Sequence, residues 1–351
     1  MSGGLQQCLY VAKNGSDVYT GSSIQPYATI QYALQQIPAN NKDPYTIYIA
    51  PGVYEEELLI TKTMVSLVGL SDDIAHSCGI RIVGNICINL IATDSQKDII
   101  VLTNITLTAP ETPIDPTAAA YTLRSMGQNY TLCLKNVMIT SYNKSTVINL
   151  EHIDNSCRVL LNRCVIQATG DGDCIDFKNG DIIAIDTCEF MAKGTGNVLN
   201  IIGEHMPNLS AVNSHFITVG GGTPLNMNVP SDKNAHLFQG CTIVSVATPS
   251  NGCLMRYGAN SDVQLLQNTF HLMGSISTPL LLLGEKSNIN FFNNIVTAQT
   301  ANGEFMPFCP ESNAEDIRIV YGGNIFTNST HIPVVSFISK GITYLQANAQ
   351  F

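Results

Sequence analysis

The sequence predicts an all-β chain of 351 residues folded as one parallel β-helix of about eleven coils. Three observations lead to this prediction. A degenerate segment recurs along most of the chain, a second series of short apolar runs lies between its copies, and the copies lack the 3.6-residue period of helical repeats.

The repeated segment has the character of two short strands joined by a polar bend. Nine copies align without gaps at intervals of 24 to 32 residues. Each starts with an apolar or aromatic residue and has Asn, Asp, Gln or Gly at its second or third position, residue types that accept turn or left-handed backbone. The copies are LTNITL, LKNVMI, LNRCVI, IDTCEF, VNSHFI, FQGCTI, LQNTFH, FNNIVT and YGGNIF, starting at Leu102, Leu134, Leu161, Ile185, Val212, Phe238, Leu266, Phe292 and Tyr321.

The second series places one side chain of each run on the outside of the coil. The runs VINL, CIDF, VLNI, PLNM, CLMR and PLLL each follow a turn-like stretch. Because side chains alternate along a strand, the third residue of each run is expected to point outward. These residues are Asn149, Asp176, Asn200, Asn226, Met255 and Leu281. We expect the four polar ones to stack as a ladder and to form the candidate ligand-binding surface.

The chain ends are expected to cap a single domain that spans 1–351. Ile30, Ala33, Leu34 and Ile37 form one apolar helical stripe, which predicts a helix near 28–37 inside an N-terminal cap of 1–45. The coils are expected over 46–330. The stretch 331–351 leaves the pattern and is expected to close the other end.

Composition narrows the partners and the location. A net charge of -10 and the lack of any run of Lys or Arg argue against nucleic acid and anionic lipid. No segment reaches the length of about 18 apolar residues that a membrane span needs, and the start does not read as a signal peptide. Polysaccharide or host glycan is the expected partner. The eleven cysteines show no CxxC pair, so we expect reduced thiols in a reducing cytosol and no metal site.

Several Cys and His residues are expected to fill the core. The alignment of the repeats puts three cysteines on one inward position and two histidines on inward positions, where buried and hydrogen-bonded side chains are expected. They are Cys164, Cys188, Cys241, His215 and His271.

The segments NGSD, PYATIQYALQQIP, YTIYIAPGVYEE and MVSLVGLS, within 11–71, resemble the start of the pectin lyase-like superfamily. The resemblance implies a right-handed β-helix. That superfamily includes pectin methylesterases, other polysaccharide hydrolases and lyases, and many viral and phage surface proteins, so the fold alone does not give an activity.

The enzyme motifs of these relatives are incomplete in the chain. Asp176 to Gly180, DFKNG, resembles one pectin methylesterase segment, but the other two are missing and the chain has no Trp. GDGDCI, Gly170 to Ile175, resembles the paired-Asp motif of polygalacturonases, yet their remaining motifs are missing. The arginines lack the context of a pectate lyase. These gaps favour a protein that is not an enzyme.

The candidate catalytic residues are Asp173, Asp176 and Glu151. One hypothesis pairs Asp176 with Glu151 across one coil as acid and base, at a separation that suits glycosidases. Lys178 is expected to form an ion pair with Glu151 and to oppose that role. The structural alternative makes Asp171 and Asp173 bend residues and Asp176 a rung of the ladder. A calcium ion at Asp171 and Asp173 is not expected, because further ligands are missing.

Together these observations predict a non-catalytic, virion-associated or particle-surface β-helix protein that binds host glycans. A homotrimer is the expected assembly, with contacts through an outward apolar stripe formed by Met255, Tyr257, Leu281 and Leu283. One alternative is a polysaccharide-active enzyme, a hydrolase or lyase acting through surface carboxylates on a pectin-like substrate. A second is a purely structural particle component.

Overall fold

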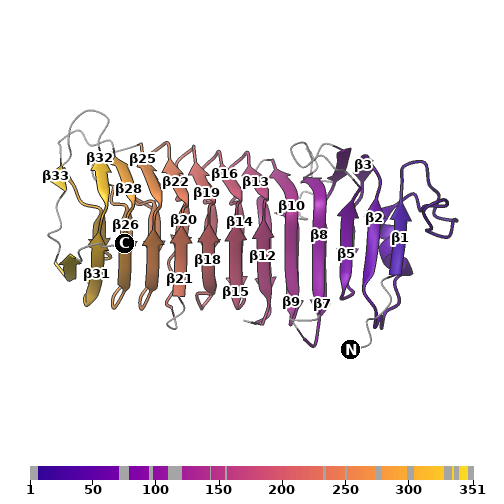
Figure 1. The fold of residues 1–351 in the computed structure, drawn as a ribbon, viewed down its shortest axis with the longest axis horizontal. Helices are drawn as coiled ribbons and strands as arrows, with labels where there is room; N and C mark the ends of the chain where they lie inside the picture. The colour runs from indigo at the N-terminus through magenta and orange to yellow at the C-terminus, as the bar shows by residue number, and fades with distance from the viewer. Residues whose placement is uncertain are drawn as a thin grey trace.

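The chain forms a right-handed parallel β-helix shaped as a straight rod, whose strands run across its long axis (Figure 1). The computed structural model describes residues 7–346 except 71–78, 95–97, 110–120, 143, 155, 232–234, 250, 274–277, 299–303, 328–333 and 336–339. The predicted fold class is confirmed. The rod has about nine turns, slightly fewer than the eleven expected.

Each coil contributes strands to three parallel stacks, of which two belong to one 22-stranded sheet and the third is a separate ten-stranded sheet. The first stack contains β1 (Gln7–Val11), β2 (Tyr45–Ile49), β5 (Val65–Gly69), β8 (Ile99–Thr108), β10 (Thr131–Ser141), β12 (Arg158–Asn162), β15 (Ile182–Asp186), β18 (Asn208–Val212), β21 (Ala235–Gln239), β24 (Asp262–Leu266), β27 (Asn288–Phe292), β31 (Ile317–Gly322) and β34 (Ile342–Gln346). The second contains β3 (Gly52–Glu55), β6 (Ile80–Val83), β13 (Val165–Ala168), β16 (Glu189–Ala192), β19 (His215–Thr218), β22 (Thr242–Ser245), β25 (Thr269–Leu272), β28 (Ile295–Ala298) and β32 (Ile325–Thr327), and the long strands β8 and β10 run through both stacks.

The ten-stranded sheet is the one that carries the predicted polar ladder. Its strands are β4 (Leu58–Ile60), β7 (Ile86–Ile91), β9 (Tyr121–Gln128), β11 (Thr146–His152), β14 (Ile175–Asn179), β17 (Leu199–Ile201), β20 (Leu225–Met227), β23 (Met255–Tyr257), β26 (Leu281–Leu283) and β30 (Phe308–Pro310). A further pair, β29 (Glu304–Phe305) and β33 (Val334–Val335), forms a two-stranded sheet.

Every copy of the repeated segment bends the chain at a residue in the left-handed conformation. The nine bend residues have φ values between 48° and 65°. They are Asn104, Asn136, Arg163, Thr187, Asn213, Gly240, Gln267, Asn293 and Gly323. The residue after each bend points inward, and where it is polar it can accept a hydrogen bond from the backbone of the preceding coil, as Asn268 does from Cys241 N at 2.8 Å. The bend is therefore what each repeat encodes.

Three copies of the repeat are displaced by one residue from the alignment made on the sequence. In the sheet, Phe238 pairs with Ala211 and Leu265, not with Val212 and Leu266. A slip of one residue turns every side chain to the other face of the strand. The prediction of inward histidines is wrong for this reason, because His215 is exposed and His271 is half-buried. Ser214 occupies the inward position instead and accepts from Cys188 N at 3.0 Å.

The core inside the coils is built from stacked apolar side chains. Cys164, Cys188 and Cys241 are buried, as predicted. Phe190 and Phe216 on neighbouring coils stack with their ring centroids 5.2 Å apart. Aromatic rings in this arrangement add to the apolar burial of each coil on the next. The core is therefore continuous along the rod.

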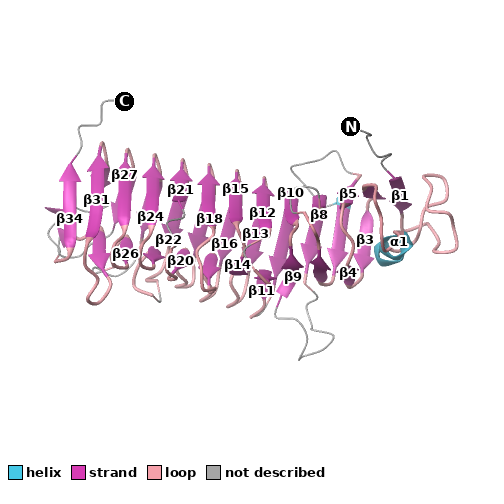
Figure 2. Cartoon of the chain, turned by 90° about the horizontal axis from the view of Figure 1, so that it is seen from below, coloured by secondary structure: helices cyan, strands magenta, loops and turns pink. Residues whose placement is uncertain are grey.

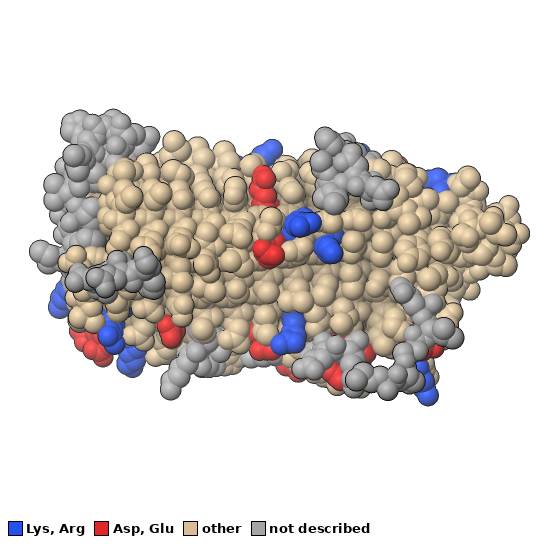
Figure 3. All heavy atoms as spheres, viewed as in Figure 1, with Lys and Arg blue, Asp and Glu red and all other residues tan. Residues whose placement is uncertain are grey.

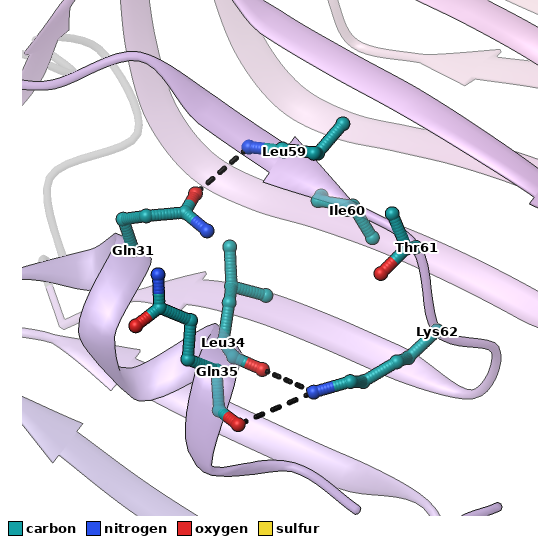
Figure 4. Close-up of a pocket in the computed structure, with 7 residues that line it drawn as sticks. All are labelled: Gln31, Leu34, Gln35, Leu59, Ile60, Thr61 and Lys62. Carbon is teal, nitrogen blue, oxygen red and sulfur yellow. Dashed lines mark hydrogen bonds between the residues drawn. The ribbon is translucent and has the colours of Figure 1, made fainter. Parts of the chain in front are cut away.

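The helix α1 (Ile30–Gln36) covers the N-terminal end of the rod, as predicted (Figure 2). It lies beside β4, the first strand of the ten-stranded sheet, where Gln31 accepts a hydrogen bond from Leu59 N at 2.8 Å. Lys62 donates to the carbonyls of Leu34 and Gln35, at 3.1 and 3.3 Å, across a hollow of about 200 Å³ (Figure 4). Burial lowers the pKa of Lys62. These contacts give hydrogen-bond partners to a backbone N–H at the sheet edge and to the last carbonyls of the helix. The hollow is therefore part of the N-terminal cap.

Part of the predicted C-terminal cap lies outside the described residues. The described segment Ile342–Gln346 forms β34, which pairs with β31 and extends the first stack. Among the described residues, no helix is long and apolar enough to cross a bilayer.

Candidate active site

A single column of outward side chains runs along the ten-stranded sheet. The residues in direct register are Leu59, Cys87, Arg124, Asn149, Asp176, Asn200, Asn226, Arg256, Leu282 and Cys309. The structure thus brings together the four ligand-binding candidates Asn149, Asp176, Asn200 and Asn226. It adds an arginine on each side, two rungs before Asp176 and three rungs after it.

The two arginines of the column were missed by the sequence reasoning. Arg256 was missed because the runs CLMR and PLLL are also displaced by one residue. Met255 pairs with Leu225, and Leu281 pairs with Met255, so both are inward residues. Arg124 was missed because no run had been assigned to β9. Aligning the runs on their buried positions, with Met255 under Leu225, would have found Arg256.

The outward apolar stripe predicted as a trimer contact is absent from the described surface. Met255, Tyr257, Leu281 and Leu283 are all fully buried. They face the core because the true register is one residue from the expected one. The trimer itself stays a prediction, but that stripe cannot supply its contact.

Asp173 and Asp176 form a carboxyl pair on this surface. Asp173 ends the bend before β14 and Asp176 is the second residue of the strand. The amide nitrogen Nδ2 of Asn200, one coil further on, donates to Asp176 Oδ1 at 2.9 Å and to Asp173 Oδ2 at 3.0 Å. Two acidic groups that share one donor must lie side by side, and both are half-buried.

The remaining oxygens of the pair are also held by the protein. Thr146 Oγ1 donates to Asp176 Oδ2 at 2.9 Å, and the backbone N–H of Asn197 donates to Asp173 Oδ1. Asn226 in turn donates to Asn200 Oδ1 at 2.8 Å and fixes the orientation of that amide. Each carboxyl oxygen therefore has one donor, which holds the pair in position before any ligand binds.

The environment of Asp173 makes this carboxyl a weaker acid than an ordinary aspartate. Burial raises the pKa of Asp173 to about 7, with further increases from its hydrogen bond to Asp176 and from the negative charge of Asp176. The donors from Asn197 and Asn200 act in the opposite direction. Two neighbouring carboxyls cannot both ionise easily, so one proton stays on the pair as the pH rises toward about 7. A proton donor and a carboxylate are then available side by side.

Glu151 has a different role from the one predicted. It forms an ion pair with Arg124 and accepts from Asn149 Nδ2 at 3.1 Å. Burial raises the pKa of Glu151, but these contacts and the positive charge of Lys178 outweigh it, and the net pKa is lowered. The expected ion pair with Lys178 is not the one formed, because a register shift after Leu150 puts Asn179 opposite Glu151. A carboxylate held by a guanidinium is a poor base.

Asp171 is engaged in the bend. Its Oδ1 accepts from the backbone N–H and the hydroxyl of Thr195 on the next coil, at 3.1 and 3.2 Å. The bends stack so closely that a Cβ on Gly196 would lie 2.1 Å from the carbonyl oxygen of Gly172. Within the described part of the chain, no three His, Cys, Asp or Glu side chains cluster as metal ligands.

A second polar group lies inside the coil, where no substrate has access. His152 Nε2 lies 3.1 Å from Ser125 Oγ, and His152 Nδ1 lies 2.8 Å from the carbonyl oxygen of Asn179. Ser125, Tyr130 and His152 are buried, and burial lowers the pKa of His152 to about 4. A neutral imidazole bonded on both sides is a structural group of the core.

No protein-family model and no curated protein matches the sequence. Among solved structures, a GH136 lacto-N-biosidase from Eubacterium ramulus matches with a TM-score of 0.55 and 9% identity, over 97% of this chain and 67% of that one. The pectin methylesterase PemA from Erwinia chrysanthemi has a TM-score of 0.44 and 17% identity, over 67% of this chain and 78% of that one. A carrot pectin methylesterase has a TM-score of 0.38 and 15% identity, over 97% and 88%.

The chain has the pectin lyase-like fold. The resemblance predicted from the N-terminal segments is thereby confirmed for the fold, while identities this low show nothing more than the fold. The prediction of a non-catalytic, virion-associated surface protein is wrong, because the solved structure that the chain matches with a TM-score of 0.55 is a lacto-N-biosidase. The result favours the alternative of a polysaccharide-active enzyme.

Proposed function

We propose that this pectin lyase-like protein is a glycoside hydrolase that uses Asp173 and Asp176 as its two catalytic residues. The observation that carries the proposal is the carboxyl pair bridged by Asn200, in which Asp173 has a pKa of about 7. Glycoside hydrolysis requires one protonated and one ionised carboxyl on either side of the scissile bond. The pair is also held on the outer face of a regular sheet, a rigid support for such a site.

In this mechanism Asp173 is the general acid. Its proton passes to the glycosidic oxygen as the bond from that oxygen to the anomeric carbon breaks. The carboxylate of Asp176 is the nucleophile and forms a covalent bond to the anomeric carbon. In the second step water attacks that carbon and releases the sugar, while Asp173 accepts the proton of the water. The proposed chemistry uses side chains alone.

The close spacing of the pair favours this double displacement. Retaining enzymes hold their carboxyls about 5 to 5.5 Å apart, whereas inverting enzymes leave roughly 6.5 to 9.5 Å for a water molecule. One amide nitrogen contacts both groups here, at 2.9 and 3.0 Å, so the two carboxyls are too close for the longer spacing. The product is therefore expected to keep the anomeric configuration of the substrate, as proton NMR of the first-formed sugar can show.

A reducing-sugar assay over a panel of plant, bacterial and animal glycans tests the proposal. Asp176→Asn is expected to lower kcat by a factor of at least about a thousand, because the nucleophile is lost. Asp173→Asn is expected to lower it most for substrates with poor leaving groups. Asp171→Asn removes a charge from the same bend without touching the pair and serves as the matched control. Wild-type protein that cleaves no glycan of the panel, or an Asp176→Asn variant with full activity, would contradict the proposal.

A further inference from the structure

A hollow of about 340 Å³ lies further along the same sheet. It is bordered by residues that directly follow β20, β23, β26 and β30, among them Asn228, Gly258, Gly284 and Glu311. Asn228 lies two residues beyond Asn226, so its side chain is on the outward side of the strand. Arg256, next to the hollow, is three rungs from Asp176, which corresponds to roughly 14 Å at the usual strand spacing. The hollow is therefore on the same face as the carboxyl pair, within reach of one short oligosaccharide.

The polar side chains at the hollow form hydrogen bonds with one another. Arg256 Nε donates to Glu311 Oε1 at 2.7 Å. With its amide oriented to match both neighbours, Asn228 accepts from Arg256 Nη2 at 3.0 Å and donates to Glu311 Oε1 at 3.3 Å. The guanidinium charge is thus balanced within the hollow, while Asn228 is exposed at its rim. Glu285, also at the rim, is paired with Lys286 at 3.4 Å.

Two glycines, Gly258 and Gly284, form part of the floor of the hollow. A Cβ on Gly258 would lie 2.2 Å from Val229 O, and one on Gly284 would lie 2.5 Å from Ala259 N. The close packing of successive coils requires glycine at both places, so no side chain covers the backbone there. Such a floor beneath an amide and a carboxylate suits a sugar ring, whose hydroxyls both donate and accept hydrogen bonds.

The charges along this face cancel. Around the carboxyl pair, Arg124 is paired with Glu151, and Lys178 lies near enough to lower the pKa of Glu151. Arg256 is the third cation of this face. The three positive charges are matched by the three carboxylates of Glu151, Asp176 and Glu311. Figure 3 shows the rod from the side where the strands of the first stack lie, and most of that surface is also uncharged. A polyuronate has a carboxylate on every sugar and would find no net positive charge on the described part of the face with the carboxyl pair.

We propose that the hollow is a distal subsite for an uncharged sugar residue of the oligosaccharide cleaved at the carboxyl pair. The oligosaccharide lies along the column of outward side chains, parallel to the axis of the rod. The substrate is accordingly a neutral glycan and not the polygalacturonate that the resemblance to pectin enzymes first implied. This inference rests on the proposed function for the position of the cleaved bond, but binding in the hollow can be measured without cleavage.

Isothermal titration calorimetry of the Asp176→Asn protein separates binding from turnover. The probes are neutral disaccharides and hexasaccharides of the lacto-N, manno and xylo series, and galacturonate oligomers of the same lengths. We expect at least one neutral hexasaccharide to bind more tightly than its disaccharide and more tightly than hexagalacturonate. Adding Asn228→Ala is expected to weaken hexasaccharide binding about tenfold, which corresponds to roughly 1.4 kcal/mol of lost hydrogen bonding. The affinity for the disaccharide is expected to stay the same.

Asn162→Ala, added in the same way, is the matched control. Asn162 is an outward asparagine on the other sheet, where it donates to Asp186 at 2.8 Å, and its loss should not affect glycan binding. The melting temperatures of both variants check that they fold. The inference would be overturned by any of three results: hexasaccharide binding that is unchanged by Asn228→Ala, tighter binding of hexagalacturonate than of every neutral hexasaccharide, or no binding of any neutral hexasaccharide. Binding that depends on Asn228 in a wild-type protein without hydrolase activity would instead overturn the proposed function alone.

Discussion

The carboxyl pair should make the stability of this protein depend on pH in a way that one substitution removes. Asp173 has a pKa of about 7 in the folded chain, against 3.8 for an ordinary aspartate. The folded state therefore binds the proton more tightly than the unfolded state does. Stability from this group is fully present below about pH 4 and is lost as the pH rises through about 7.

Asparagine at this position imitates the protonated acid. The shift of about three pKa units corresponds to an upper bound of roughly 4 kcal/mol, at about 1.36 kcal/mol for each unit. Asp173→Asn should thus gain stability relative to wild type as the pH rises from 4 to 8, by up to roughly 4 kcal/mol. The free energy of unfolding, measured by urea titration at several pH values, gives this difference directly.

The two proteins share every other titrating group, so the contributions of groups that do not interact with Asp173 cancel. Asp171→Asn reports the general effect of removing one negative charge from an acidic chain. If the stability difference between Asp173→Asn and wild type is the same at every pH, or grows as the pH falls, the interpretation of Asp173 as a proton-holding carboxyl is refuted.

Other perturbations test the coil packing and the buried groups. Phe216→Ala removes a stacked ring from the core and should cost about 3 to 5 kcal/mol of unfolding free energy by denaturant titration. Gly196→Ala drives a Cβ against the backbone of the preceding bend and should cost more than about 2 kcal/mol, whereas Gly252→Ala, whose Cβ meets nothing within 4 Å, should cost only the roughly 1 kcal/mol of its left-handed backbone. Arg124→Met breaks an ion pair whose two side chains are 33% and 34% exposed, so a thermal-melt comparison should show a loss below about 1 kcal/mol. His152 has a pKa of about 4 when folded, so the stability present above about pH 6.5 should fall as the pH drops toward 4, and His152→Gln should flatten that fall.

The sequence predicts the positions of the bends better than the register of the short strands. The bend residues are recognisable because only certain residue types accept a left-handed backbone. Of the nine bend residues, all except Arg163 are Asn, Gln, Thr or Gly. The short strands lack such a marker. In CLMR the first three positions are apolar and in PLLL the last three are, so the sequence allowed either register, and the wrong one turned Met255 outward.

The sequence by itself determined the fold class, the N-terminal helix, the polar ladder and the identity of the acidic residues. These follow from local patterns: alternation, turn chemistry and an apolar helical stripe. Only the tertiary structure decided which acid works with which. Asp173 meets Asp176 through an asparagine from the next coil, and Glu151 meets Arg124 from the coil before. Contacts between coils depend on the stacking register, which is fixed by the packing of the whole core and not by any short stretch of chain.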